Sequence, residues 1–288
     1  MQFNKVVLIT GCSSGIGFIT ALTFARHKYT VFASVRNLKS DGVKELIEIT
    51  SKEKLDLHVI EIDVIHEKNV IQGVTQIIKV AKKIDVLVNN AGFGALGPVE
   101  AFTDQEIKNQ FETNVFGTIR MIKAVAPIMR QQGSGTIINI GSINGLIAFP
   151  LYGMYASSKF AIEALTESLR FELRQFGIKV ALVEPGTFIT DFSKNRKLPE
   201  SLQNDLSPYK KTVKVFFDKL DVKAKKLHIG FISKLVDSKR VADKIYKIAE
   251  SNNPKLHNRV GIDSHVYYFG KKILPNYFWQ FILQKVYK

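Results

Sequence analysis

The chain has 288 residues, is 45% hydrophobic and carries a formal net charge of +15. Residues 194–288 hold 21 Lys and Arg against 8 Asp and Glu, but no zinc-finger, basic-zipper or RNA-recognition motif accompanies this charge, so no nucleic-acid partner is predicted. A single cysteine, Cys12, excludes an internal disulfide, and no apolar run approaches the roughly 18 to 20 residues of a membrane-spanning helix.

Short runs rich in β-branched residues predict six strands. They are Val6–Ile9, Tyr29–Ser34, Leu57–Ile62, Asp85–Asn89, Gly135–Ile140 and Ile178–Glu184. The first run starts after only five residues, which leaves no room for a secretory leader and predicts a cytoplasmic protein. The run Arg259–Ile262 is consistent with a final strand.

Helix-length segments with apolar residues three and four positions apart lie between these strands. They cover residues 15–27, 41–50, 66–83, 103–131 and 153–176, and a further segment covers 238–251. Such alternation is typical of right-handed crossovers and a parallel sheet with helices on both faces. The predicted fold class is therefore α/β, with residues 1–288 forming a single-domain, Rossmann-type doubly wound sheet.

Two segments depart from this alternation. Residues 187–235 follow the sixth strand, are rich in lysine and contain scattered aromatics, which predicts a lid that selects the substrate. Residues 263–288 form a C-terminal extension, in which the stretch Gly270–Lys285 has the apolar spacing and basic flanks of an amphipathic helix. That helix could rest on a membrane surface, close the pocket or pack on another subunit of a homo-oligomer, and the sequence does not choose among these roles.

Gly11, Gly15 and Gly17 lie where the first strand turns into the first helix. Without side chains, the backbone there can approach a pyrophosphate at the positive end of the helix. A tight strand-to-helix turn could use the same glycines, so the surrounding strand and helix carry the prediction of a dinucleotide site.

The end of the second strand indicates which dinucleotide is preferred. An acidic residue there would bind the ribose 2′-hydroxyl of NAD, but Ser34 and Val35 occupy these positions. Arg36 follows and can offer a planar, charged fork to the 2′-phosphate of NADP. NADP(H) is therefore favoured, and NAD(H) stays the alternative if Arg36 is only a solvated loop charge.

The spacing Tyr-x-x-x-Lys occurs three times, at Tyr155, Tyr267 and Tyr268. Only Tyr155 follows a serine at a strand end, Ser142, and only it begins a helix next to a central strand. Lys159 would share its helix face, since residues four apart are neighbours. A neighbouring ammonium favours the phenolate and would lower the tyrosine pKa from about 10 toward working pH.

These motifs together resemble the short-chain dehydrogenase/reductase family over about residues 3–262. Thr10–Gly17 matches the family's Thr-Gly-x-x-x-Gly-x-Gly loop, which implies cofactor contacts at Gly11, Ser13, Ser14, Gly15, Ile16 and Gly17. The resemblance further implies that Asp63 lies near the adenine and that Asn90, Ala91 and Gly92 support the site beside the cofactor. Pro185, Gly186 and Thr190 match the family's turn on the nicotinamide side.

The resemblance also implies roles for four polar residues. Tyr155 would exchange a proton with the substrate oxygen while Ser142 holds that oxygen and Lys159 tunes the phenol. Asn114 resembles the family asparagine that holds a water linking the lysine to solvent, although a local helix-bending hydrogen bond is another interpretation of this residue. The six histidines show no pair at helical ligand spacing, so no catalytic metal is predicted.

Within the family, the chain resembles the branch of 17β-hydroxysteroid and retinol dehydrogenases, which implies a lipophilic alcohol, ketone or aldehyde as substrate. Candidates for an apolar pocket are Phe93, Leu96, Phe149, Met154, Phe188 and Phe192. Two rival interpretations are a non-catalytic NADP sensor and a basic nucleic-acid-binding protein. The intact set of Asn114, Ser142, Tyr155 and Lys159 favours an active oxidoreductase over both.

Overall fold

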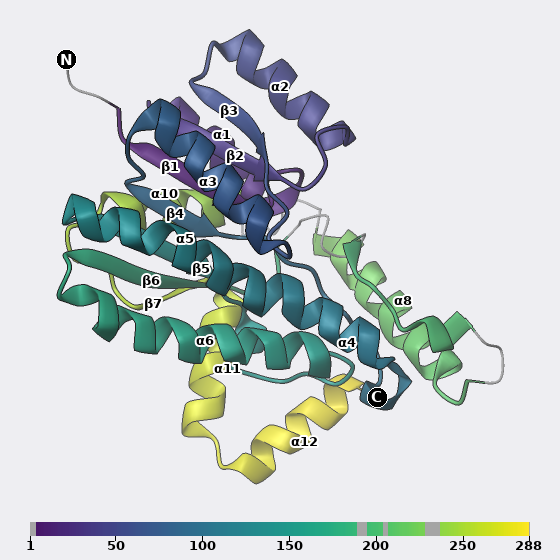
Figure 1. Cartoon of the computed structure of the whole chain (residues 1–288). Coiled ribbons are helices and arrows are strands. Elements are labelled where there is room, and N and C mark those ends of the chain that lie inside the picture. The colour runs from purple at the N-terminus through teal and green to yellow at the C-terminus, as the bar shows by residue number, and fades with distance from the viewer. Residues whose placement is uncertain (1–3, 189–194, 204–206, 228–236, 288) are drawn as a thin grey trace.

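A computed structural model describes residues 4–188, 195–203, 207–227 and 237–287. These residues form a seven-stranded, all-parallel sheet in the order β3-β2-β1-β4-β5-β6-β7 (Figure 1). The strands are β1 (Val6–Thr10), β2 (Thr30–Val35), β3 (Leu57–Glu61), β4 (Val86–Asn89), β5 (Gly135–Ile140), β6 (Ile178–Pro185) and β7 (His257–Val260). The predicted α/β, doubly wound fold class is confirmed.

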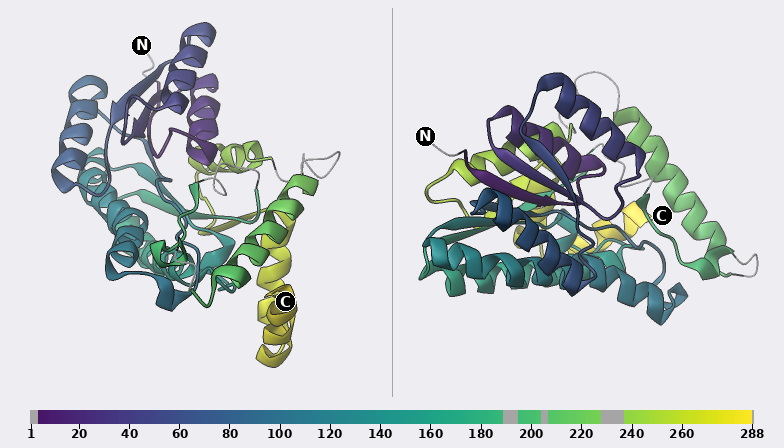
Figure 2. Two further views of the ribbon diagram at one scale, coloured as in Figure 1. Left: turned by 90° about the vertical axis from the view of Figure 1, so that its right-hand side faces the viewer. Right: turned by 45° about the horizontal axis from the view of Figure 1, so that its top comes forward.

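Helices cover both faces of this sheet (Figure 2). Residues of α1 (Gly15–Arg26), α2 (Asp41–Glu53) and α10 (Lys239–Glu250) share one hydrophobic core with the sheet. Residues of α3 (Glu67–Ala81), α5 (Gly117–Gln132) and α6 (Gly153–Arg174) share the other core, on the opposite face. Since both faces are covered, the central strands β1 and β4 are buried at every position, which explains their runs of Val, Leu and Ile.

The strand order reverses between β1 and β4, which are neighbours in the sheet although β2 and β3 lie between them in the chain. In an open parallel sheet this switch point leaves a crevice beyond the carboxyl ends of the strands, where ligands bind. The glycine turn follows β1, and Ser142 follows β5 at the same edge. The topology therefore brings the glycine turn and the predicted catalytic residues to one edge of the sheet.

Three predicted elements differ from the structure. The helix expected over 103–131 is divided into α4 (Asp104–Phe111), a π-helical turn η2 (Glu112–Phe116) and α5. The last strand lies two residues earlier than predicted, because Gly261 has a φ of 104° and ends it. The single tail helix expected over 270–285 is wrong: α11 (Ile262–Ile273) and α12 (Asn276–Tyr287) are separated at Pro275, which lacks an N–H and disfavours a helical preceding residue.

The described part of the segment 187–235 contains η4 (Glu200–Gln203) and α8 (Lys210–Leu227). In both views of Figure 2, α8 lies outside the helical layers that cover the sheet. A bridge between Ala95 and Lys197 joins this segment to the loop after β4. Within the described residues, no helix has both the length and the hydropathy needed to cross a bilayer.

Candidate active site

The turn from β1 to α1 is shaped by contacts that exclude side chains. Gly11 has a φ of 73°, and a Cβ there would lie 2.8 Å from the Cα of Ala91. A Cβ on Gly17 would overlap the carbonyl oxygen of Gly11. The side-chain amide of Asn90 donates to the carbonyl oxygens of Thr10 and Gly11, at 2.9 and 3.1 Å. The loop is therefore held close to the segment after β4, and it can pack this tightly only because glycine stands at both positions.

The first turn of α1 fits an anionic ligand. Ser14 is the N-cap, but its side chain caps no backbone amide, and the first turn carries no acidic residue. Gly15 and Ile16 open the helix and are partly buried, like Ser13. The positive end of the helix dipole is thus not neutralised by the chain's own acids, which suits a pyrophosphate.

Arg36 lies immediately after β2, beside this turn. The amide of Cys12 donates to the carbonyl oxygen of Ser34 at 3.0 Å, which ties the glycine turn to the end of β2. Arg36 is exposed, and it makes no ion pair with any residue that the structure describes. Its side chain is therefore exposed at the end of β2. Asp63, two residues past β3, is partly buried and its carboxylate accepts from the amide of Ile65 at 3.2 Å, so it closes a turn.

The segment after β4 is anchored to the glycine turn. The hydroxyl oxygen of Thr10 accepts from the amides of both Asn90 and Ala91, each at 2.9 Å. Gly92 approaches Asn114 so closely that a Cβ would lie 3.0 Å from the amide oxygen of Asn114. These contacts hold residues 90–92 in place between the glycine turn and η2.

Ser142, Tyr155 and Lys159 come together in the structure. Tyr155 and Lys159 lie one turn apart on α6, and all three side chains are buried. A side-chain hydrogen bond joins Ser142 to Tyr155. The ammonium of Lys159 donates to the carbonyl oxygen of Ile140 at 2.8 Å and lies 5.8 Å from the centre of the Tyr155 ring.

Burial controls the protonation of this group. It raises the pKa of Tyr155 to about 12, while the hydrogen bond from Ser142 acts in the opposite direction and nearby Tyr152 adds to the rise. It lowers the pKa of Lys159 to about 8, against the attraction of Glu163. That Lys159 brings the phenol pKa down stays a prediction; the largest influence on the Tyr155 pKa in this structure is burial, which raises it.

Asn114 lies in the π-helical turn η2 and is almost fully buried. Its amide nitrogen donates to the carbonyl oxygen of Phe93 and to the hydroxyl oxygen of Ser158, and its amide oxygen accepts from the amide of Phe93. Single π turns are frequent at functional sites. The side chain of Asn114 thus bonds to neighbours of the predicted catalytic residues, and not to Lys159 itself, within the described part of the chain.

The turn after β6 is closed by a residue that the sequence did not single out. The amide of Gly186 donates to the carbonyl oxygen of Val260 at 2.8 Å, and the carboxylate of Asp263 accepts from the amide of Thr187 at 2.6 Å. A Cβ on Gly186 would overlap that carboxylate. Thr190, predicted to complete this turn, lies outside the described residues.

The sequence profile described as short chain dehydrogenase matches residues 5–201. The chain belongs to the short-chain dehydrogenase family. It is 35% identical over 284 residues to a 3-ketodihydrosphingosine reductase of Bacteroides thetaiotaomicron, with 98% of each chain covered. It is 36% identical over 263 residues to human retinol dehydrogenase 8, covering 90% of this chain and 82% of that protein.

A solved structure titled ElxO with NADP bound is also similar, with a TM-score of 0.70 and 28% identity over 89% of this chain and 97% of that one. The predicted family is therefore confirmed, and so is the resemblance to its hydroxysteroid and retinol dehydrogenase branch. The protein is a short-chain dehydrogenase/reductase and hence an oxidoreductase.

In this short-chain dehydrogenase, Tyr155 packs against the described part of the segment that was predicted to select the substrate. Tyr155 shares a hydrophobic cluster with Leu96 and with residues of η4 and α8. The members from η4 and α8 are Leu202, Val213, Phe216 and Phe217. The surroundings of Tyr155 are therefore apolar and are formed largely by that segment.

The other candidate pocket residues are distributed around this cluster. Phe149 packs in a second cluster with Trp279 of α12, and Phe188 packs at the edge of the core shared by α1 and α10. Phe93 stacks beneath Lys197 at 5.0 Å and provides the backbone partner of Asn114. Met154 is partly buried in the first turn of α6, and Phe192 lies outside the described residues.

The two other Tyr-x-x-x-Lys pairs lie on α11 and serve packing. Tyr267 packs edge-on against Phe149 and Trp279, with ring centres 5.2 and 6.0 Å apart. Tyr268 lies beneath the guanidinium of Arg259, 3.4 Å from the ring centre. The sequence analysis did not identify Ser158 or Asp263. Ser158 could have been noticed because it precedes Lys159, whereas no sequence signal indicates Asp263.

Proposed function

We propose that this short-chain dehydrogenase uses NADP(H) to interconvert a lipophilic ketone or aldehyde and the corresponding alcohol, with Tyr155 as the general acid and base. The observation that carries the proposal is the buried group of Ser142, Tyr155 and Lys159 at the carboxyl edge of the sheet. It lies at the edge where the glycine turn could hold the pyrophosphate of a dinucleotide.

The residues divide the chemistry between them. Reduced nicotinamide, when bound, supplies a hydride to the carbonyl carbon. The phenol of Tyr155 donates its proton to the carbonyl oxygen, and the hydroxyl of Ser142 holds that oxygen as negative charge develops on it. The positive charge of Lys159 stabilises the phenolate that remains. One hydride and one proton added to the carbonyl group give the alcohol.

The protonation of Tyr155 near neutral pH suits its role as the acid in carbonyl reduction. Because burial raises the pKa of Tyr155 to about 12, the phenol keeps its proton and is prepared to act as an acid. Oxidation of an alcohol would require the phenolate first.

Arg36 supports NADP(H) over NAD(H). It is exposed beside the glycine turn, without an ion-pair partner among the described residues, and no acidic residue ends β2. Arg binds phosphate through parallel N–H donors, which an NAD ribose would leave unused. We retain NAD(H) as the alternative cofactor.

An apolar substrate is supported by the cluster around Tyr155. Phe216 and Phe217 of α8 pack with Tyr155 and Leu96, so a substrate reaching Tyr155 would contact hydrocarbon and aromatic surface. The relatives named ketodihydrosphingosine reductase and retinol dehydrogenase support the same class of substrate. We therefore propose a long-chain or polycyclic carbonyl compound.

We also propose that α11 and α12 place the enzyme on an anionic membrane surface. The two helices project from the body of the protein in Figure 1, and apolar side chains are exposed along them. This apolar face of α11 and α12 consists of Ile262, Val266, Phe269, Ile273, Tyr277, Phe278 and Phe281. Exposed Lys271 and Lys272 lie in the last turn of α11, which suits anionic headgroups. A second copy of the chain is the competing occupant of this face.

The proposed chemistry is tested by following NADPH absorbance with long-chain, retinoid and steroid ketones and aldehydes. We expect Tyr155→Phe to lower kcat by at least about 100-fold while the Kd for NADPH stays within twofold of the wild type. Tyr268→Phe, the same change in a Tyr-x-x-x-Lys pair on α11, should retain activity. NADPH binding without turnover of any substrate by the wild type would favour the sensor interpretation, and full activity of Tyr155→Phe would refute the proton-transfer role.

A further inference from the structure

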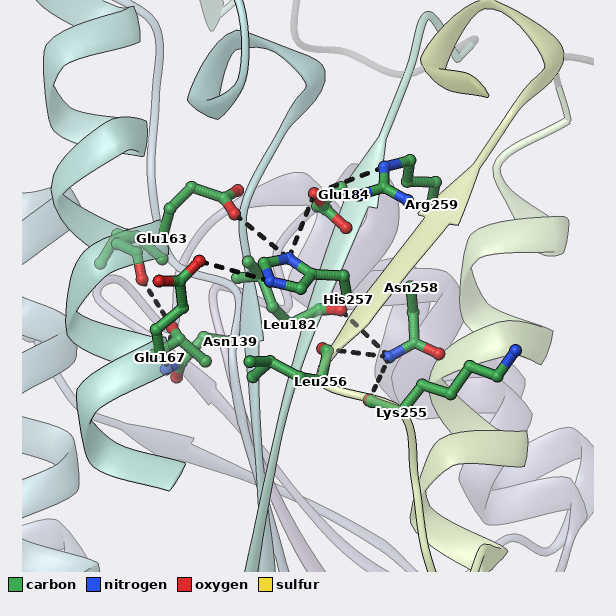
Figure 3. Close-up of polar contacts among 12 residues, drawn as sticks. Asn139, Glu163, Glu167, Leu182, Glu184, Lys255, Leu256, His257, Asn258 and Arg259 are labelled. Carbon is green, nitrogen blue, oxygen red and sulfur yellow. Dashed lines mark hydrogen bonds and ion pairs between the residues drawn. The ribbon is translucent and has the colours of Figure 1, made fainter. Parts of the chain in front are cut away.

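A buried cluster of charged residues that the proposed chemistry does not use lies one helical turn beyond Lys159 (Figure 3). Glu163 on α6 and Glu184 on β6 point toward His257 of β7. The Nδ1 atom of His257 lies 3.6 Å from Glu163 and 3.5 Å from Glu184, while the Nε of Arg259 lies 3.9 Å from Glu184. We refer to Glu163, Glu184 and His257 as the acid cluster.

The two carboxylates of the acid cluster are poorly compensated. Glu184 is fully buried and the side chain of Glu163 is 9% exposed, yet the Nδ1 atom of His257 stays 3.5 Å from the one carboxylate and 3.6 Å from the other, too far for a strong hydrogen bond. Two buried carboxylates beside one arginine that is 3.9 Å away leave an excess of negative charge. Burial, followed by the charges of Glu184 and Glu167, raises the pKa of Glu163 to about 9, so this carboxyl keeps a proton at neutral pH.

A divalent cation is the other way to balance this charge, since ligand atoms of Glu163, Glu184 and His257 lie within 4.8 Å of one another. Positive charge already faces both carboxylates, however. Arg259 approaches Glu184, and Lys159 lies one turn before Glu163 and influences its charge. A bound metal would be repelled by both, whereas a proton shared within the cluster would not.

Glu163 connects the acid cluster to the proposed active site in two ways. Its carboxylate packs against the loop that carries Ser142: a Cβ on Gly145 would lie 2.6 Å, and one on Gly141 2.9 Å, from its Oε1 atom. Positions 141 and 145 of this loop can therefore hold only glycine as long as the carboxylate of Glu163 stays where it is. Glu163 and Lys159 are also coupled: the negative charge that Glu163 acquires on losing its proton raises the pKa of Lys159 against the effect of burial, and the charge of Lys159 lowers the pKa of Glu163.

His257 connects the acid cluster to solvent. Its Nε2 atom lies 3.3 Å from the carboxylate of Glu167, which is on the next turn of α6 and has a side chain that is 53% exposed. In Figure 3, dashed lines join His257 to both Glu163 and Glu167, so these contacts connect a buried carboxyl to one that is half exposed.

We propose that Glu163 is a positioning residue for Ser142 and Lys159, and that the acid cluster exchanges a proton with solvent through His257 and so sets the upper pH limit of turnover. The second part rests on the proposed function, because the limit is that of the Tyr155 reaction. When the acid cluster loses its proton at alkaline pH, it becomes negatively charged. This charge favours the protonated form of Lys159, so Lys159 loses its proton at a higher pH. The groups that face Glu163 are Lys159 and Glu167 on α6, Glu184 on β6, and His257 and Arg259 on β7, with His265 of α11 near Glu184.

The test replaces Glu163 by the isosteric, neutral glutamine. We expect the alkaline limb of kcat in Glu163→Gln to move to lower pH by about half a unit or more, because Lys159 loses a neighbouring negative charge. Glu184→Gln should also move the alkaline limb to lower pH, but by less than Glu163→Gln does, because Glu184 lies on β6 and not on the helix that carries Lys159. Glu172→Gln, on the exposed surface of α6, should leave the limb unchanged.

A second measurement does not depend on turnover. The pKa of the Lys159 ammonium, followed by NMR with ¹³Cε-labelled lysine and assigned with Lys159→Arg, should be lower in Glu163→Gln than in the wild type. A Lys159 pKa that is the same in Glu163→Gln as in the wild type would overturn the inference even if the enzyme is active. If the wild type shows no turnover but the Lys159 pKa is lower in Glu163→Gln, only the proposed function is refuted. A divalent ion that copurifies with the wild type at one per chain, and is lost in Glu163→Gln, would also overturn it.

Discussion

The amide nitrogen of Asn114 donates a hydrogen bond to the hydroxyl oxygen of Ser158 at 3.1 Å, and that hydroxyl donates to the carbonyl oxygen of Tyr155 at 2.7 Å. The first bond joins the π-helical turn η2 to α6, and the second lies in the first turns of α6 itself. Together with the two bonds between Asn114 and Phe93, they connect the loop after β4 to the helix that carries Tyr155 and Lys159. Asn114 therefore stabilises the arrangement on which the proposed proton transfer depends.

We predict that Asn114→Ala lowers the free energy of unfolding by about 1–3 kcal/mol, since it removes three buried hydrogen bonds and takes from the amide of Phe93 its bond to the Asn114 side chain. Its kcat should fall as well, because α6 is no longer held against η2. Urea unfolding and turnover would be measured in parallel. Asn109→Ala, an exposed residue on the surface of α4, is the matched control and should stay within about 0.5 kcal/mol of the wild type. A stable, fully active Asn114→Ala protein would contradict this role.

Local sequence was sufficient to predict the strands but not the break in the helix 103–131. The strands are buried on both faces, so their runs of β-branched residues are unambiguous. The π turn at residues 112–116 depends on bonds from Asn114 to Phe93 and Ser158, which are 21 and 44 positions away. No local pattern contains that information.

The same reason explains why the sequence did not indicate the acid cluster. Glu163, Glu184 and His257 are widely separated along the chain, and the pairing of β6 with β7 together with the packing of α6 on β6 brings them together. That pairing sets Leu182 opposite His257 and Glu184 opposite Arg259. The glycine turn and the pair of Tyr155 and Lys159 could be located because their residues lie close in sequence and their spacing has a direct geometric meaning.

Arg36→Ala should raise the Kd for NADPH by about 10- to 100-fold and leave the Kd for NADH nearly unchanged. A hydrogen bond between charged groups contributes about 1.5–3 kcal/mol, and only NADPH has the 2′-phosphate that would receive it. Fluorescence titration with both dinucleotides measures the difference. Lys39 is a nearby exposed cation, and Lys39→Ala should weaken the binding of neither dinucleotide. If Arg36→Ala weakened the binding of NADPH and NADH equally, Arg36 would be excluded as the ligand of the 2′-phosphate.

The stability of the protein should fall as the pH rises from 5 to 8. Burial raises the pKa of Glu163 from 4.5 to about 9, and it raises the pKa of Glu184 as well. The folded state therefore binds more protons than the unfolded state in this window, and its stability decreases with increasing pH. Lys159, whose pKa is lowered from 10.5 to about 8, acts in the opposite direction only above about pH 8.

We expect the loss between pH 5 and pH 8 to be on the order of 4 kcal/mol from Glu163 in the wild type, since each pH unit changes the stability by about 1.4 kcal/mol per proton. Urea unfolding at fixed pH measures this loss. Glu163→Gln removes one of the two carboxyl groups and should show a shallower slope, whereas Glu172→Gln should keep the wild-type slope. An identical slope for Glu163→Gln and the wild type would mean that the carboxyl of Glu163 does not retain its proton in the folded protein.

The apolar face of α11 and α12 provides the last prediction. Phe269 and Phe278 are 51% and 56% exposed on the two helices, while Trp279 packs beneath them against Ile143 and Ile147 and anchors α12 beside the Ser142 loop. The double variant Phe269→Glu/Phe278→Glu therefore alters the face without disturbing that anchor. Burying one phenylalanine in a bilayer contributes about 1.5–3 kcal/mol, so the variant should bind vesicles of phosphatidylcholine and phosphatidylserine at least about tenfold more weakly than the wild type.

Co-sedimentation measures this difference, and Phe171→Glu, at an exposed position of α6, is the control that should pellet like the wild type. Wild-type binding should also weaken when phosphatidylserine is omitted, because Lys271 and Lys272 then lose their anionic partners. Equal pelleting of the double variant and the wild type would exclude the apolar face as the membrane contact. A wild-type dimer in light scattering that the double variant converts to a monomer would assign the face to a second copy of the chain, since one surface cannot be covered by a subunit and a bilayer together.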